Sequence, residues 1–286
     1  MNNQSSKNPI LRVARDLITR QQNPKSIPTV YFTDIVNVGD LLNEYLIPIL
    51  SGKRVIRVNS SMTSHLRAVG SVIGSASRNS HIWGSGSIDG KPPNRQLAIE
   101  KIHAVRGEKT REMLSLFTGA NLRHLPLGDP GILMSQYYKP EVIASGCIGI
   151  IPHFSDETLV KKYIRDTNSD NIKIISVRQQ PEAFILDICA CSYIFSSSLH
   201  GLILADSYSI PNKWISVSEN LIGGAFKFED YYSTTNKTDE SCLKIDSLNE
   251  FVRAVGQPEL FCKAKTFQND MSRLVKSFPL DFTDKF

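Results

Sequence analysis

Residues 193–218, YIFSSSLHGLILADSYSIPNKWISVS, decide the fold. A buried strand at 193–198 runs into an apolar helix at 199–209, and a second strand follows at 213–218. Two strands joined by a helix at this spacing are expected to be parallel, because the helix returns the chain to the same edge of the sheet. The segment therefore predicts an α/β fold with helices covering a parallel sheet.

The same alternation of strand and helix continues on both sides of this segment. It predicts two parallel sheets in series that leave a cleft between them, with the carboxyl ends of the strands as the ligand-binding edge. The other expected strands are 29–33, 54–58, 68–74, 81–84 and 102–106 in the first half and 147–153 and 172–177 in the second, and the expected helices are 41–50, 108–117, 156–167 and 181–191.

The length of 286 residues favours two domains. A Gly- and Pro-punctuated stretch at 125–133 ends the first, and a polar stretch at 136–146 is the expected linker. We expect an N-terminal extension with an amphipathic helix at 1–27, a Rossmann-like domain at 28–140, a second at 141–245, and closing helices at 246–286, over 246–255 and 258–277.

Composition excludes several classes of protein. Apolar residues make up 41% and charged residues 21% of the chain, which excludes global disorder. No apolar run is long enough to span a bilayer, and the N-terminus is polar where a signal peptide is apolar, so we expect a cytoplasmic protein. The five cysteines are odd in number and are expected to be free thiols in a reducing compartment, with no metal site.

The charge is divided unevenly along the chain. Residues 1–140 hold 18 Lys and Arg but 9 Asp and Glu, a net charge of +9, whereas the remainder carries −4. This asymmetry indicates an anionic partner for the first half. Because there is no run of Lys and Arg and no basic strand interleaved with aromatic residues, a small anion or an anionic membrane surface is favoured over nucleic acid.

The segment 10–20 predicts a basic amphipathic helix. Its apolar positions fall on one helical face and most of its arginines fall off that face. Such a helix can lie peripherally on anionic lipid at the cytoplasmic face of a membrane, or its apolar face can pack against its own domain. The apolar positions are Ile10, Leu11, Ala14, Leu17 and Ile18.

The turn from strand to helix at Ser197, Ser198, Leu199 and His200 is the strongest candidate for chemistry. The first turn of a helix has unpaired N–H groups and the positive end of the helix dipole, so this turn is a candidate anion site. An imidazole there can exchange protons near neutral pH, which makes His200 a candidate acid/base. The alternative is that Ser198 only caps the helix and that His200 is a satisfied, partly buried histidine.

Two further groups follow strands of the first half. Arg106 ends the strand 102–106, where a guanidinium can bind a carboxylate or phosphate through two parallel hydrogen bonds; the alternative is a surface ion pair with Glu108 or Glu112. The loop after the first strand carries carboxylates and an amide that suit the hydroxyls of a sugar or a helix cap. Its candidate acceptor-binding residues are Asp34, Asn37 and Asp40.

Three cationic groups stand near strand ends in the second half. His153 follows the strand 147–153, Arg178 follows the strand 172–177, and Lys227 lies in the aromatic segment FKFEDYY at 226–232. Together they place positive charge around one edge, where a small polyanion would bind.

In seven ordered segments the chain resembles the polysaccharide pyruvyltransferases. These enzymes transfer the pyruvyl group of phosphoenolpyruvate to two hydroxyls of a sugar, forming a pyruvate ketal during synthesis of exopolysaccharide, capsule or other cell-surface glycans. The resemblance covers roughly residues 29–235. Its segments are Asn37 to Asn43, Val105 to Gly107, Gly128 to Pro130, Ile148 to His153, Ser196 to Asp206, Ile210 to Pro211, and Phe226 to Tyr231.

The resemblance implies a fold and roles for residues. The fold is that of two-domain glycosyltransferases with facing Rossmann-like domains and an interdomain cleft, the first domain on the acceptor side and the second on the donor side. His200 corresponds to the proposed acid/base and Arg106 to an arginine that binds phosphoenolpyruvate. Many members carry an arginine where this chain has Ser198, so Arg178 or Lys227 is expected to supply that charge.

The reaction requires phosphoenolpyruvate as a co-substrate and demands no metal or nucleotide cofactor. The acceptor is a sugar, free or lipid-linked. Because fold does not fix function, two alternatives stand beside it. One is a glycosyltransferase that takes a nucleotide sugar, in which Glu229 or Asp230 would hold a ribose. The other is a non-catalytic carbohydrate-binding relative.

Overall fold

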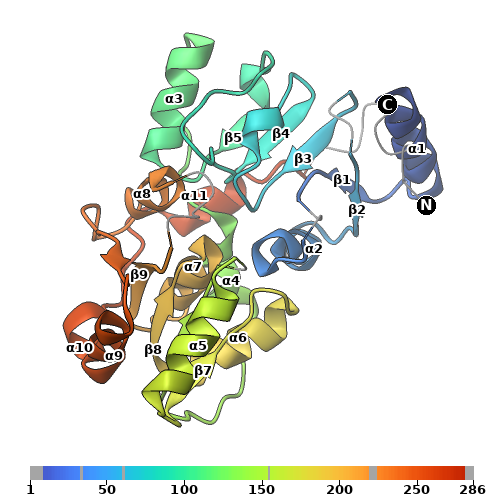
Figure 1. The fold of residues 1–286 in the computed structure, drawn as a ribbon. Coiled ribbons are helices and arrows are strands. Elements are labelled where there is room, and N and C mark those ends of the chain that lie inside the picture. The colour runs from blue at the N-terminus through green and yellow to red at the C-terminus, as the bar shows by residue number, and fades with distance from the viewer. Residues whose placement is uncertain (1–8, 33–34, 60–61, 154, 219–223, 281–286) are drawn as a thin grey trace.

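The computed structural model describes residues 9–32, 35–59, 62–153, 155–218 and 224–280 (Figure 1). Within these ranges the strands form two five-stranded sheets, and every pair of neighbouring strands is parallel. The predicted α/β class with two parallel sheets is confirmed. The arrangement as two facing glycosyltransferase-like domains stays a prediction.

The first sheet has the strand order β2-β1-β3-β4-β5. The chain starts at β1, moves to the edge strand β2 and then builds outward to the other edge, so the connection from β2 to β3 crosses over β1. The strands are β1 (Ile27–Thr29), β2 (Val55–Arg57), β3 (His65–Arg67), β4 (Ser80–Trp83) and β5 (Ile102–Ala104).

The second sheet has the order β10-β9-β8-β6-β7. The strands β6 and β8 lie at its centre, so the loops that follow them meet at one edge. The strands are β6 (Cys147–Ile151), β7 (Ile172–Ile174), β8 (Cys191–Ser196), β9 (Asn212–Ser216) and β10 (Leu243–Lys244).

Helices cover the second sheet on both faces. One apolar cluster joins inward residues of β6 and β8 to Val160 and Phe251, from the contacting helices α5 and α9. The opposite face packs on α6 and α7. The helices are α1 (Pro9–Gln22), α2 (Val38–Ser51), α3 (Glu108–Thr118), α4 (Met134–Tyr137), α5 (Glu157–Thr167), α6 (Pro181–Cys189), α7 (Leu199–Ser207), α8 (Phe226–Tyr232), α9 (Leu248–Gly256), α10 (Pro258–Phe261) and α11 (Met271–Lys276), with 3₁₀ turns η2 (Ile73–Ser75), η3 (Ile99–Lys101) and η4 (Pro130–Leu133).

Three predicted elements differ from the structure. The strand predicted at 29–33 is β1 at Ile27–Thr29, and the strand predicted at 68–74 is instead β3 at His65–Arg67. Gly70 has φ +117°, outside the range of regular β-strands, and the chain bends at 69–71, with residues 68–70 buried. The single helix predicted over 258–277 is two short helices, α10 and α11, separated by nine residues that are not helical.

The two halves share apolar packing. One buried cluster contains Trp83 of the first sheet together with Ile203 of α7 and Leu274 of α11. The Trp83 indole N–H donates to the Leu274 carbonyl at 2.9 Å, and its ring meets the Phe278 ring edge-on. The C-terminal segment therefore returns to the first half, as the red α11 beside the first sheet shows in Figure 1. The boundaries near residues 27, 140 and 245 stay predictions.

The N-terminal helix α1 turns its apolar face outward. Leu11, Leu17 and Ile18 are each about half exposed, whereas Asp16 and Arg20 are buried. Asp16 accepts hydrogen bonds from the backbone N–H of Asn59, and Arg20 donates to the Ser64 carbonyl. The helix therefore packs against its own domain through its polar residues Asp16 and Arg20, while its apolar positions stay about half exposed.

Two further observations concern the whole chain. The five cysteines all lie in the described ranges, and all are free thiols, as predicted. In the part of the chain that the structure describes, no helix is long and apolar enough to cross a membrane.

Candidate functional site

A cavity of about 320 Å³ lies where loops from the two sheets meet. A larger surface hollow, about 610 Å³, lies beside α3, but none of the predicted site residues line it. The smaller cavity is therefore the candidate site. The first half lines it with Phe32, Asn37, Asp40, Gly70, Ser71, Val72 and Ile88, and the second half with His153, Ser198, Leu199, His200 and Lys227.

His200 is the second residue of α7 and packs against the start of α2. A Cβ placed on Gly39 would lie 2.0 Å from the His200 Nδ1 atom, so only glycine allows the ring to approach α2 this closely. Asn37 caps α2 by accepting a hydrogen bond from the Gly39 N–H. The N-x-G-D segment thus holds a helix start against the imidazole.

The turn before α7 is built by serine hydroxyls. Ser196 Oγ accepts from the Ser198 N–H at 3.0 Å and donates to the Ser198 carbonyl at 2.9 Å. Ser198 stands at the N-cap, but its side chain makes no cap hydrogen bond, so the alternative in which it only caps the helix is wrong. The start of α7 therefore keeps donors and the positive end of its dipole at the cavity.

The nearest charged partner of His200 is Asp129, which was not among the predicted site residues. The His200 Nε2 atom lies 3.6 Å from the Asp129 Oδ2 atom, and the carboxylate is fully buried. Asp129 Oδ1 accepts from the Gly131 N–H at the start of η4. Among the described residues, neither Nε2 nor Oδ2 has a hydrogen-bond partner, so His200 is not a satisfied core histidine. The sequence feature that could have identified Asp129 is its place in the G-D-P segment at Gly128 to Pro130.

Asp40 lies on the same cavity and is electrostatically coupled to His200. Its Oδ1 accepts from the Phe32 N–H at 3.0 Å. Burial raises the pKa of the Asp40 carboxyl to about 6, although the charges of His200 and Arg57 and the Phe32 hydrogen bond act in the opposite direction. The cavity therefore holds a carboxyl group that takes up a proton more readily than an ordinary aspartate.

Asp40→Asn is expected to raise the free energy of unfolding above pH 7 by up to about 3 kcal/mol. Because the folded pKa of about 6 lies above the usual 3.8, the folded protein binds more protons between these values. The free energy of unfolding of the wild type therefore falls as pH rises from 3.8 to about 6, because the buried Asp40 carboxyl must ionise. Asparagine does not titrate, so the variant keeps its stability over this range. Urea denaturation at several pH values measures the difference, which should shrink towards pH 4; a constant difference would contradict the burial argument.

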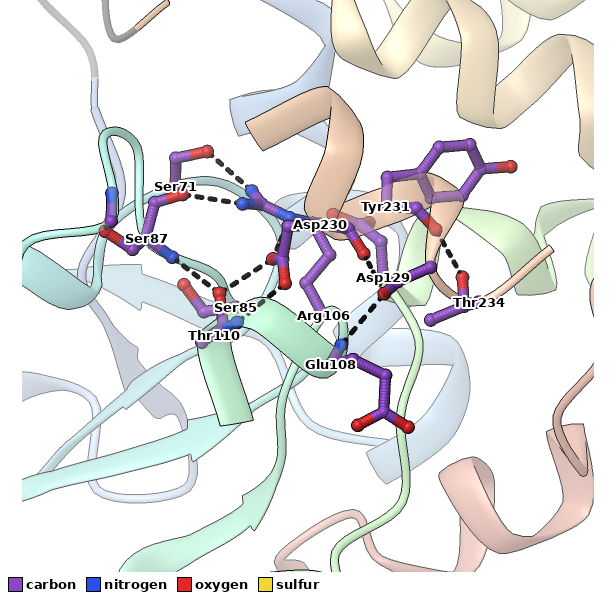
Figure 2. Close-up of polar contacts among 12 residues, drawn as sticks. Ser71, Ser85, Ser87, Arg106, Glu108, Thr110, Asp129, Asp230, Tyr231 and Thr234 are labelled. Carbon is purple, nitrogen blue, oxygen red and sulfur yellow. Dashed lines mark hydrogen bonds and ion pairs between the residues drawn. The ribbon is translucent and has the colours of Figure 1, made fainter. Parts of the chain in front are cut away.

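Arg106 is fully buried and binds protein groups (Figure 2). Its Nε donates to Asp230 Oδ2 at 2.9 Å, its Nη1 to Ser71 Oγ at 2.7 Å and its Nη2 to the Ser87 carbonyl at 2.6 Å. Arg106 is not among the residues that line the cavity, but Ser71 joins it to that lining. The alternative pairing with Glu108 or Glu112 is wrong, because the ion-pair partner is Asp230.

Asp230 ties α8 to the first half of the chain. Besides Arg106, it accepts from the N–H and the hydroxyl of Thr110 at 2.7 Å each. A Cβ on Gly107 would lie 1.8 Å from the Asp230 carbonyl oxygen, which explains the glycine of the R-G segment. Glu229 pairs with Lys109 at the surface. Asp230 is thus engaged as a buried anchor, which disfavours the ribose-binding role considered above.

The remaining predicted residues divide between the cavity and the surface. Lys227 and His153 both line the cavity, and Ser197 supports it because its hydroxyl accepts from the His153 N–H at 2.7 Å. Burial, with the nearby charge of Arg106, lowers the pKa of Lys227 to about 8. Burial also lowers the pKa of His153. Arg178 is exposed and does not line the cavity, and Asp34 lies outside the described residues.

Comparison with known proteins identifies the family of the chain. The family model described as polysaccharide pyruvyl transferase matches residues 31–219. An uncharacterized protein of Acanthamoeba polyphaga mimivirus is 31% identical over 219 residues, which cover 73% of this chain and 74% of that protein. An uncharacterized protein of Klebsiella pneumoniae is similar at 14% identity with a TM-score of 0.43, covering 86% of this chain and all of that one. The matched region contains the cavity residues from Phe32 to His200, and the chain belongs to the polysaccharide pyruvyl transferase family.

Proposed function

We propose that this protein transfers the pyruvyl group of phosphoenolpyruvate to two hydroxyls of one sugar, forming a pyruvate ketal during synthesis of a cell-surface glycan such as exopolysaccharide or capsule. The observation that carries the proposal is the position of His200, which lies on one cavity with Lys227 and the start of α7. An acid/base beside a site for an anion is what this reaction requires.

The donor is proposed to bind on the second half of the cavity. Its phosphate lies at the start of α7, near Ser198, Leu199 and Lys227, because N–H groups at a helix start and an ammonium both favour an anion. Lys227 supplies the charge that an arginine at position 198 gives to many relatives. Arg106, whose charge is paired with Asp230, fixes Ser71 at the cavity wall.

The acceptor is proposed to bind on the first half of the cavity. Asn37 and Asp40 line that half, and a carboxylate can accept hydrogen bonds from sugar hydroxyls. Placing the sugar there puts its hydroxyls opposite the donor, with His200 between the two halves.

The chemistry balances with one imidazole. Protonated His200 gives a proton to the methylene carbon of phosphoenolpyruvate, and the first hydroxyl attacks the central carbon. His200 takes up the proton of that hydroxyl. The second hydroxyl then attacks the same carbon, the bond to the phosphate oxygen breaks, and the second proton leaves with phosphate. The products are the ketal and inorganic phosphate, and His200 is regenerated.

The direct test incubates the protein with radiolabelled phosphoenolpyruvate and candidate glycan acceptors and measures label in the glycan together with phosphate release. The same acceptors with nucleotide sugars provide the opposing arm. Acid-labile label on the glycan, with phosphate in equal amount, supports the proposal. Transfer of sugar from a nucleotide donor, or binding of glycan without turnover of either donor, overturns it in favour of the other classes.

Donor binding is expected to weaken as pH rises through the Lys227 pKa of about 8. Above that pH the ammonium loses its proton, so the KM for phosphoenolpyruvate should increase about tenfold between roughly pH 7 and 9. Lys227→Met should show a high KM at all pH values and a flat profile. A matched control is Lys109→Met, which removes an exposed lysine of an ion pair with Glu229. The same rise of KM in Lys227→Met would locate the titration elsewhere.

Reversible binding to anionic lipid is expected through the outward apolar face of α1. Leu17 and Ile18 are exposed beside arginines in the half that carries the charge of +9, a surface suited to a membrane that holds lipid-linked acceptors. Sedimentation with anionic liposomes should fall as salt rises and drop about tenfold in Leu17→Asp/Ile18→Asp. Leu116→Asp, an exposed leucine on α3, is the control. Full-length protein that stays in the supernatant at low salt would favour a soluble acceptor.

A further inference from the structure

Two buried polar atoms that face each other lack hydrogen-bond partners among the described residues. One is Nε2 of His200 and the other is Oδ2 of Asp129, 3.6 Å apart. Leaving a buried polar atom unpaired is costly, because the atom loses its hydrogen bonds to water, so such groups in native proteins call for an explanation. Their distance is slightly longer than a hydrogen bond, and contacts of this kind often tighten when a substrate binds.

The surrounding elements hold the pair in place from both sides. Asp129 is fully buried, and its other oxygen is fixed by the Gly131 N–H at 3.0 Å. His200 is held by α7, which packs directly on η4, the turn that Asp129 begins. Gly39 confines the opposite side of the ring. The carboxylate therefore comes from the first half of the chain and the imidazole from the second, and neither side chain is free to turn away.

We infer that Asp129 is a positioning residue that fixes the neutral His200 ring with its proton on Nε2. A buried carboxylate accepts hydrogen bonds and cannot donate them, so the ring nitrogen that faces it carries the proton. The lone pair is then on Nδ1, at the side of Gly39 and α2. Since Nε2 is buried and about a tenth of the His200 side chain stays exposed at the cavity, Nδ1 is the nitrogen that exchanges protons with substrate.

This assignment rests on the proposed function for its catalytic meaning. When His200 carries a second proton on Nδ1, that proton faces the cavity, and the Asp129 carboxylate compensates the positive charge from behind. Asp129 also keeps the ring from presenting a donor to the cavity in the neutral state, when it must accept the proton of the attacking hydroxyl. Asp129 itself touches neither substrate.

Asp129→Asn is the decisive variant, because it preserves size and the cap. The amide oxygen can still accept from the Gly131 N–H, which leaves the NH₂ group directed at His200 Nε2. That donor favours the opposite tautomer, with the proton on Nδ1. We expect near-normal folding and a loss of pyruvyl transfer of at least about 100-fold in kcat, with little change in the KM for phosphoenolpyruvate.

The tautomer is read independently of activity by ¹⁵N NMR of the histidine rings, with His200 assigned from the signals missing in His200→Gln. The wild type should show a protonated Nε2 and Asp129→Asn a protonated Nδ1. The matched control is Asp206→Asn, a buried aspartate on the same helix that contacts Asn212, Tyr231 and Lys265 instead of His200. It should change stability but leave both tautomer and kcat as in the wild type.

The outcomes separate this inference from the proposed function. A wild-type His200 protonated on Nδ1, or an unchanged tautomer in Asp129→Asn, overturns the inference whatever reaction the enzyme performs. A kcat of Asp129→Asn that stays as close to the wild type as that of Asp206→Asn assigns Asp129 to stability alone. A tautomer switch in a protein that never turns over phosphoenolpyruvate supports the positioning role and refutes the proposed reaction.

Discussion

His200→Gln is expected to fold like the wild type and to lose pyruvyl transfer by at least about 100-fold, because a positioned acid/base contributes on that order to the rate. Glutamine keeps hydrogen-bonding capacity and approximate size but cannot exchange a proton near neutral pH. The loss should fall on kcat, with the KM for phosphoenolpyruvate changed little, since the phosphate is proposed to bind Lys227 and the start of α7.

The matched control for this experiment is His124→Gln, which changes an exposed histidine away from the cavity. It should retain full transfer. Circular dichroism and thermal unfolding of both variants show whether loss of activity reflects loss of structure. Near-normal transfer by purified His200→Gln would assign the proton transfers to another group, and Asp40, with its pKa raised to about 6, would be the next to test.

The largest effect on stability is expected from Asp230→Ala. It should lower the free energy of unfolding by about 3–5 kcal/mol, because removal of one partner leaves the other charge buried and unpaired. Both side chains of the Arg106–Asp230 ion pair are fully buried. The carboxylate also satisfies both donors of Thr110, so the variant strands three donors at once. Urea denaturation measures the change in midpoint and slope.

Glu229→Ala is the internal control, because Glu229 is adjacent in sequence and its ion pair with Lys109 is about 40% exposed on both sides. Its cost is expected to stay below about 1 kcal/mol. A double variant, Arg106→Met/Asp230→Leu, should recover part of the loss, since an apolar pair of similar volume avoids the stranded charge. Equal effects of Asp230→Ala and Glu229→Ala would contradict the buried-anchor role.

The network around Asp230 also bears on the site, because it sets the position of α8. Lys227 is the second residue of this helix, and Ser71 is held by Arg106, the ion-pair partner of Asp230. Substitutions that loosen α8 are therefore expected to disturb the cavity as well as the core. The activity of these variants has to be measured well below their unfolding temperature, so that loss of activity does not simply reflect unfolded protein.

The sequence by itself determined the class of fold and the residues of the strand-to-helix turn. The sequence predicts the strand and helix around His200 because both are short, continuous apolar segments that suit burial, and the structure contains both at nearly the predicted limits. The ordered motifs likewise predicted the family. Prediction failed at 68–74, where apolar residues are buried by the turn at Gly70 and the pattern of burial does not reveal the backbone conformation.

The tertiary structure alone decided which of the predicted charged residues act together. Arg106, Lys227 and Arg178 were all predicted to place positive charge at the donor site. In the structure Arg106 is buried in an ion pair with Asp230, Lys227 lines the cavity and Arg178 is exposed. Asp129 and His200 are separated by about 70 residues, and Arg106 and Asp230 by more than 120. Their pairing depends on packing between the two halves, which is set by contacts distant in the chain, and no local pattern of residues encodes such a distance.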